Sequence, residues 1–266
     1  MISIFSILRG VVLFSLASSQ VFSADDDGYS LWPRRPEELE AARRLMGEQK
    51  YDDAVSLLHP FVQEVGIAGR EARQMTGAIN VRRYLSRNHP RAQVHLVKRG
   101  ETLARISAEC ACPTDLIMLL NGIVEPSDLK AGQKIVVVPM DLRMELRPLQ
   151  RELSVWDGVQ LVASYNVLGA EGFKKDANEE TEVSDRPGYI GGVLLSSRST
   201  QFLCSDRGLL LANGISLVSG ESGQGRVVKL ERKDLNELTL LMGIGSRVSV
   251  VYDDSAFQQE VPSSAD

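Results

Sequence analysis

The sequence is poor in the residues that most often build reactive or metal-binding centres. It has three cysteines and three histidines in 266 residues, and they do not have the spacing of a zinc site. Cys110 and Cys112 are one residue apart and cannot easily bridge each other. We therefore expect buried or free thiols, with a bridge from either residue to Cys204 as the alternative, and we expect no metal and no cofactor.

The chain also lacks an excess of positive charge. Its formal net charge is -5, which gives no basic footprint for nucleic acid. Apolar content of 43% and charged content of 24% are ordinary for a globular protein. Because domains commonly have about 100–200 residues, we expect roughly two of them, and no nucleic acid among the partners.

Long apolar runs are scarce, and the one candidate lies at the N-terminus. Residues 11–17 read VVLFSLA, follow the single charge of Arg9, and precede small residues up to Ala24. This pattern predicts a signal peptide over residues 1–24, with cleavage near Ser23 or Ala24. The alternative is an uncleaved anchor, for which the run is short. We expect an exported protein of the periplasm or cell wall, with no membrane span in the mature chain.

Residues 25–90 are expected to form a linker followed by a helical region. Apolar residues at helical spacing predict one helix after Pro36, a second after Asp52 that bends or ends at Pro60, and a third that ends before His89. The first two helices resemble a single tetratricopeptide-like hairpin. One such unit is no repeat array, so we interpret it as a brace against the rest of the protein. A peptide-binding groove is the functional alternative.

Residues 94–139 have the pattern of a complete small unit. A short strand at residues 95–98 precedes a turn, and Thr102 is a good N-cap for a helix with Leu103 and Ile106 on its buried face. Thr114 is expected to cap a second helix that stops at residues 121–122. A closing strand follows at residues 135–138, so the expected order is strand, helix, helix, strand.

This pattern closely resembles a LysM module. The matching residues are Gly100-Glu101-Thr102-Leu103, Ile106-Ser107, Leu116 with Asn121, Leu129, Gly132-Gln133-Lys134-Ile135 and Val138-Pro139. The resemblance implies binding to N-acetylglucosamine-containing glycan, above all the glycan strands of peptidoglycan. It also implies a groove between two loops, formed by Gly100, Glu101, Thr102, Leu103, Asn121, Gly122, Ile123 and Val124. In the alternative interpretation, the turn residues only build the fold.

From residue 141 the apolar pattern changes to a period of two, typical of strands. Asp157-Gly158 predicts a hairpin turn. The acidic stretch from Glu171 to Asp185 is interpreted as mobile, and Asp234 is expected to cap a helix. Residues 254–266 form a polar tail. Further strands are expected at Gly191–Ser197, Gln201–Cys204, Leu209–Ala212, Ile215–Val218, Val227–Leu230 and Val248–Tyr252.

Residues 141–253 resemble the L,D-transpeptidase catalytic domain. The similar stretches are LSVWDGVQLVASYNV at 153–167, DRPGYI at 185–190 and DLNELTLLMGIGSRVSVVYD at 234–253. The expected fold class is therefore α+β multidomain. It has an N-terminal helical hairpin region, a small βααβ LysM module, and a C-terminal mainly-β L,D-transpeptidase-like domain with one helix near its end.

The reactive residues of that family are missing. The family carries H-G in one strand and S-H-G-C-[IV]-R in the next, with the cysteine as nucleophile. By position, the first pair falls on Ser219-Gly220, the second histidine on Gly225, the cysteine on Val227 and the arginine on Lys229. The three histidines are at positions 59, 89 and 95, all upstream, so no Cys–His nucleophile can be assembled within the domain.

We therefore predict no catalytic residues and an inactive domain that acts as a binding or scaffold module, with peptidoglycan or a cell-wall synthesis protein as partner. The alternative is an active acyl-transfer enzyme on peptidoglycan stem peptides. It would use a substituted nucleophile, such as a Ser–Lys arrangement of Ser219 or Ser222 with Lys229. A third hypothesis is structural: the module packs against the chain's own β domain and the whole is an assembly subunit.

Overall fold

The computed structural model describes residues 37–174, 177–190, 193–195, 206–220 and 225–252. The expected signal peptide, the polar tail and the strand expected at Gln201–Cys204 lie outside the described residues. Among the helices that are described, none has both the length and the apolar character needed to cross a membrane.

The helical region begins with α1 (Glu37–Gly47) and α2 (Tyr51–Leu58), followed by the 3-10 turn η1 (His59–Phe61) and the long helix α3 (Ile67–Tyr84). Three glutamates occupy the first turn of α1, where negative charge suits the helix dipole. Pro60 falls in η1, so α2 ends where the sequence predicted. The hairpin packs on α3 through a small apolar core: Leu39, Ala42, Ala54, Leu58, Ala72, Met75 and Ile79.

The next unit has the predicted order of elements. It comprises β1 (Gln93–Leu96), α4 (Leu103–Cys110), α5 (Thr114–Asn121), the 3-10 turn η2 (Pro126–Asp128) and β2 (Lys134–Val137), and the two strands pair antiparallel. The Thr102 side chain accepts a hydrogen bond from the Arg105 backbone N–H at 3.3 Å, as expected of an N-cap. The prediction that Thr114 caps α5 is wrong. Pro113 holds the cap position, and Thr114 is the first helical residue.

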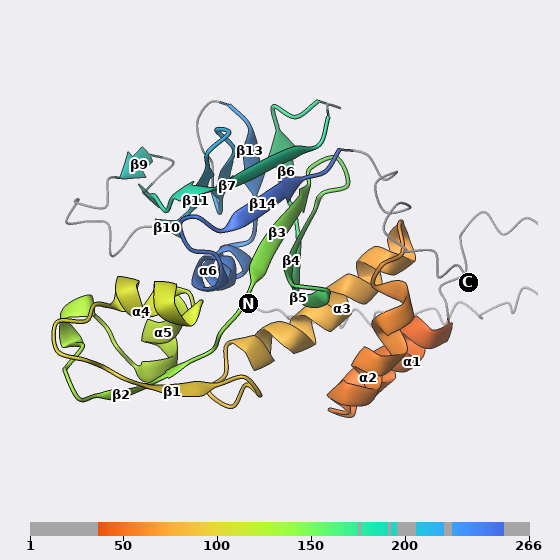
Figure 1. The fold of residues 1–266 in the computed structure, drawn as a ribbon. Coiled ribbons are helices and arrows are strands. Elements are labelled where there is room, and N and C mark those ends of the chain that lie inside the picture. The colour runs from red at the N-terminus through yellow and green to blue at the C-terminus, as the bar shows by residue number, and fades with distance from the viewer. Residues whose placement is uncertain (1–36, 175–176, 191–192, 196–205, 221–224, 253–266) are drawn as a thin grey trace, which may run out of the picture. The chain divides into compact units, whose positions relative to one another are not determined.

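The C-terminal region is mainly β (Figure 1). Its nine-stranded sheet has the order β5-β4-β3-β14-β7-β11-β12-β13-β6, and β10-β8-β9 form a separate three-stranded sheet. The hairpin predicted at Asp157-Gly158 joins β4 to β5, with Gly158 at a positive φ of 59°. The elements are β3 (Leu142–Arg147), β4 (Glu152–Asp157), β5 (Gln160–Asn166), β6 (Gly169–Glu171), β7 (Glu179–Asp185), β8 (Gly188–Ile190), β9 (Val193–Leu195), β10 (Asp206–Arg207), β11 (Leu209–Leu211), β12 (Ser216–Val218), β13 (Val227–Lys229), α6 (Arg232–Leu241) and β14 (Arg247–Val250).

Two local predictions in this region are wrong. The acidic stretch expected to be mobile contains β7, which pairs with β14 on one side and β11 on the other. Its single valine, Val183, is fully buried. Glu179 and Glu180 have polar partners: the Asn213 side-chain amide donates to Glu179 at 2.7 Å, and the Ser249 hydroxyl donates to Glu180 at 3.0 Å. Asp234 does not cap α6, because Glu231 holds that position and Asp234 lies within the first turn.

The helical region packs tightly against the sheet through α3 and β5. Gly77 of α3 lies so close that a β-carbon there would come within 2.5 Å of the Ser164 backbone nitrogen. A buried arginine reinforces the contact: the Arg73 guanidinium makes two hydrogen bonds to the Glu152 carboxylate, at 2.6 and 2.8 Å. The helical region is therefore an integral part of the β domain's packing.

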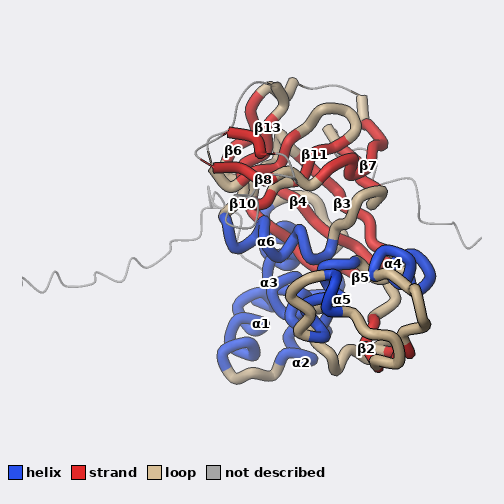
Figure 2. The backbone as a smooth tube through the Cα atoms, turned by 90° about the vertical axis from the view of Figure 1, so that its left-hand side faces the viewer, coloured by secondary structure: helices blue, strands red, loops and turns tan. Residues whose placement is uncertain are grey.

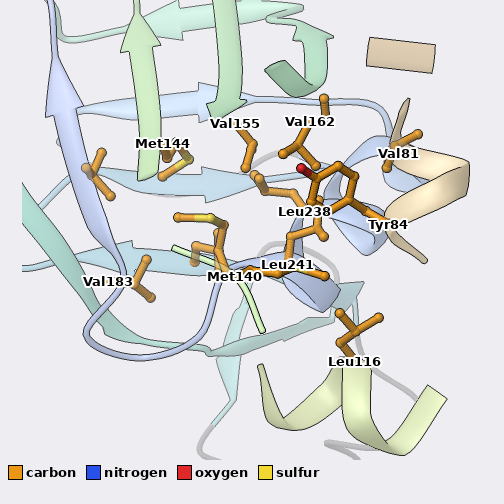
Figure 3. Packing of buried hydrophobic residues seen from close by; sticks show 14 of the residues in the cluster. Val81, Tyr84, Leu116, Met140, Met144, Val155, Val162, Val183, Leu238 and Leu241 are labelled. Carbon is orange, nitrogen blue, oxygen red and sulfur yellow. The ribbon is translucent and has the colours of Figure 1, made fainter. Parts of the chain in front are cut away.

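One apolar core joins the LysM unit to the β domain. Figure 3 shows Tyr84 of α3, Leu116 of α5 and Leu241 of α6 within it. Helix α6 lies between α5 and the strands of the large sheet, as both ribbon and tube views show (Figure 1, Figure 2). Arg186 spans the same contact, donating to the Asp115 carboxylate of α5 and, at 2.6 Å, to the Thr239 carbonyl of α6. The predicted α+β fold class is confirmed, with the module packed on the β domain.

Candidate functional site

The two loops predicted to form the groove lie at the same end of the α4–α5 pair. The first loop leads into α4 and the second leads out of α5. The helices contact each other and are joined only by residues 111–113, which is the geometry of an antiparallel helix hairpin. The fold therefore brings residues 100–103 and 121–124 together.

Only some of the predicted groove residues offer a side chain or backbone to solvent. Gly100, Thr102 and Gly122 are exposed, and Val124 is 81% exposed. Leu103 and Ile123 are buried, with 3% and 7% of their surface exposed, and belong to the core. A ligand in this groove would meet the first set, while the two buried residues support the loops from below.

Two polar residues of the predicted groove hold the fold together. One oxygen of the Glu101 carboxylate accepts the Lys98 backbone N–H at 2.7 Å and contacts His95 Nε2 at 2.9 Å. The hydrogen bond from His95 and that from the Lys98 backbone lower the pKa of Glu101. Asn121 donates to the carbonyls of Ile117 and Val136, both at 2.8 Å, and accepts from the Val136 N–H at 2.7 Å. These side chains position the loops.

The loops also present unused backbone donors. Within the described residues, the backbone N–H groups of Gly100, Thr102, Leu103 and Val124 donate to no acceptor. Of these residues, Leu103 is buried, whereas Gly100, Thr102 and Val124 are exposed and come from both loops. The Val124 side chain adds an apolar surface. This combination suits a neutral ligand with carbonyl or hydroxyl oxygens and an apolar face, as an N-acetylated sugar has.

A thiol contact in this domain was missed by the sequence reasoning. Cys110 Sγ lies 3.9 Å from His95 Nδ1, the imidazole whose other nitrogen contacts Glu101. Burial, followed by the charges of Glu109 and Glu101, raises the pKa of Cys110, and burial raises that of Cys112 to about 11. Neither thiol is thus favoured as a thiolate at neutral pH. The described residues contain no group of three or more possible ligands around a metal site.

The structure separates some of the positions where the transpeptidase motif was expected. Strands β12 and β13 are parallel, with Ser216 opposite Val227 and Val218 opposite Lys229. Ser219 therefore lies three residues, or about 10 Å, along the sheet from the level of Val227, since a strand rises ~3.3 Å per residue. Gly220 follows Ser219, and Gly225 precedes β13 at the other end of the strand pair.

The side chains at these positions have structural surroundings. Val227 is 1% exposed and lies in the sheet interior. The Lys229 ammonium forms an ion pair with Glu171 at 2.6 Å. Ser222 and Cys204 lie outside the described residues. Among the described positions, none presents an exposed nucleophile next to a free base.

The comparisons with known proteins identify the module. Residues 95–138 match the family model described as LysM domain, which confirms the prediction made for residues 94–139. No curated protein matches the chain. The chain therefore carries a LysM domain packed on a mainly-β domain.

Several solved structures match the chain, among them two L,D-transpeptidases. L,D-transpeptidase 1 of Mycobacterium tuberculosis is 9% identical with a TM-score of 0.30, over 46% of this chain and 67% of that one. An L,D-transpeptidase of Xylanimonas cellulosilytica is 13% identical with a TM-score of 0.32, over 85% of this chain and 100% of that one. Both carry the name of the family that residues 141–253 resemble. Because both TM-scores lie below 0.5, the role of the β domain is inferred from its own residues.

Proposed function

We propose that this chain is an exported protein that binds the N-acetylglucosamine-containing glycan strands of peptidoglycan through its LysM domain. The observation that carries the proposal is the LysM match over residues 95–138. LysM domains bind peptidoglycan glycan, which indicates association with the cell wall. The backbone N–H groups of the exposed residues Gly100, Thr102 and Val124, together with the Val124 side chain, supply suitable contacts at one end of the α4–α5 pair. A single module should bind weakly, because it gains nothing from multivalency.

Pelleting with purified peptidoglycan sacculi tests the groove. Val124→Glu places a charge on an 81% exposed groove residue, and Val159→Glu makes the same change at a 91% exposed hairpin residue of the β domain. Neither valine is in the core, so both variants should fold. We expect the wild type and Val159→Glu to pellet and Val124→Glu to stay largely in solution. If the wild type stayed in solution, or if both variants pelleted equally, glycan binding at this groove would be excluded.

The β domain is proposed to act as a non-catalytic binding or scaffold module, either for stem peptides or for a cell-wall synthesis protein. All three histidines precede it in the sequence, Val227, the position on which the family's nucleophile is expected to fall, is buried, and Lys229 is paired with Glu171. Packing of α5 on α6 leaves the groove loops exposed, so the scaffold role is compatible with glycan binding.

Measurement of the intact mass of the chain tests the proposal that the β domain is catalytically inactive. The chain is incubated with a β-lactam and with an electrophilic stem-peptide analogue, and we expect its mass to be unchanged. A stoichiometric adduct mapped to a serine of the β domain or to Cys204 would favour the alternative, an acyl-transfer enzyme on stem peptides with a substituted nucleophile. Export is tested separately, by sequencing the N-terminus of chain recovered from outside the cytoplasm, which should begin near Ala24.

A further inference from the structure

A cavity of about 720 Å³ lies outside the LysM domain, where the α1–α2 connection faces the C-terminal half of α3. Residues 86–90, which follow α3, close its far side. Its volume is in the range of cavities that hold drug-sized ligands or short peptides. Three helices and one connecting segment thus line the cavity, in the region where the sequence predicted three helices and left a peptide-binding groove as the alternative to a structural brace.

The interior of the cavity is largely apolar. Met46 from the end of α1, Tyr51 from the start of α2 and Ile79 from α3 line it, together with Ala78 and Pro90. Ile79 is 5% exposed and belongs to the core beneath the cavity. Ala78 is exposed, so it lies at the open side. A surface of this kind accepts an aliphatic or aromatic side chain.

The polar groups of the cavity are mainly donors. Arg83 forms an ion pair with Asp52 at 2.6 Å, and Asp52 is the only acidic residue in the lining. The Arg82 guanidinium makes no hydrogen bond or ion pair within the described residues, although its charge acts to lower the pKa of Glu237 on α6, which burial raises. His89 Nδ1 accepts the Arg91 backbone N–H at 3.2 Å, which leaves Nε2 to carry the proton as a donor.

The cavity is therefore a site of positive charge on a protein whose net charge is -5. Arginine donors above an apolar surface are complementary to a carboxylate attached to an apolar group. We propose that this cavity binds a short acidic peptide, with its carboxylate held by Arg82 and Arg83 and an adjacent apolar side chain against Met46 and Ile79. The proposal does not depend on glycan binding, because none of these residues belongs to the LysM domain.

Fluorescence anisotropy with three labelled pentapeptides tests the proposal on the full chain. The first is Ala-Ala-Ala-Leu-Phe with a free C-terminal carboxylate, the second is its C-terminal amide, and the third is the amide of Ala-Ala-Glu-Leu-Phe. Binding of the first or third peptide, at least tenfold tighter than the neutral second one, is expected. The comparison of the first with the third distinguishes a terminal from a side-chain carboxylate. Equal binding of the neutral amide, or no binding of either acidic peptide at millimolar concentration, would overturn the proposal.

Variants then locate the binding. Arg82→Gln removes a guanidinium that makes no hydrogen bond within the described residues, and we expect it to weaken binding about tenfold, the effect of losing a charge-assisted hydrogen bond. The matched control is Arg87→Gln, an exposed arginine of the same segment that does not line the cavity. Ala78→Trp should fill the opening and abolish binding. Circular dichroism checks that each variant is folded. Equal losses in Arg82→Gln and Arg87→Gln, or undiminished binding by Ala78→Trp, would place the peptide elsewhere.

Discussion

Arg73 should be among the most important polar residues for stability, because it anchors the helical region to the sheet. Its guanidinium makes two short hydrogen bonds to Glu152 and two more to the carbonyls of Val62 and Glu64, at 2.9 and 2.8 Å. Arg73 is 5% exposed and Glu152 3%. Arg73→Met would leave the Glu152 carboxylate buried, with the Ser164 hydroxyl at 3.4 Å and the Arg70 Nε at 3.9 Å as its remaining partners. A buried ion pair broken in this way typically costs about 3–5 kcal/mol.

The double variant Arg73→Met/Glu152→Leu removes the stranded charge as well. We expect it to recover the part of the loss that comes from the unpaired carboxylate, whereas the two unsatisfied carbonyls, about 1–3 kcal/mol for each if fully buried, destabilise both variants. Arg105→Met is the control, because Arg105 is a 70% exposed partner of Glu109 and such a pair contributes at most about 1 kcal/mol. Urea unfolding, followed by the fluorescence of the buried Trp156, gives all four free energies of unfolding. An Arg73→Met variant no less stable than Arg105→Met would refute the reasoning.

Three further predictions concern other contacts. Gly77→Ala should lower the melting temperature and cost about 1–3 kcal/mol, because the added methyl meets β5 backbone at 2.5 Å, whereas Gly47→Ala, with nothing within 4 Å, should be harmless. The hydrogen bond with His95 lowers the pKa of Glu101, so the ionised carboxylate stabilises the fold at pH values above the ordinary pKa of 4.5. This stabilisation should be lost as the pH falls below 4.5 and through the lowered pKa. Acid titration of Glu101→Gln should lack this component. With the other two cysteines replaced by serine, Cys112 should resist a thiol reagent at pH 8 until the chain is unfolded, since its pKa is about 11.

The LysM domain could be predicted from the sequence because its signals are local. A cap at Thr102, a left-handed residue at Gly122 and apolar residues at helical spacing each act within a few residues of chain. The groove loops followed from the same motif. The motif did not reveal that Glu101 and Asn121 use their side chains inside the fold, because those partners lie on neighbouring elements.

The β domain was harder to predict because its stability depends on distant pairing. Strand β7 contains one apolar residue, Val183, among acidic and small polar ones, so its composition gave no strand signal. It is a strand because β14 and β11 satisfy its backbone on both sides. The relative positions of Ser219 and Val227 likewise depend on how β12 pairs with β13 in the sheet. Alignment of the sequence with a family motif does not reveal that pairing.

The shared core of the LysM and β domains affects how the protein would sit on a polymer. A LysM module on a flexible linker can bind a glycan strand while the attached domain takes many orientations. This module is held against the β domain by Leu116 in the shared core and by Arg186 across the α5–α6 contact. A glycan held in the groove would therefore impose one orientation on the whole β domain. Such an attachment would not let the β domain move away from the glycan strand to which the module is bound. It would instead present the same face of its sheet at every point along the strand where it binds.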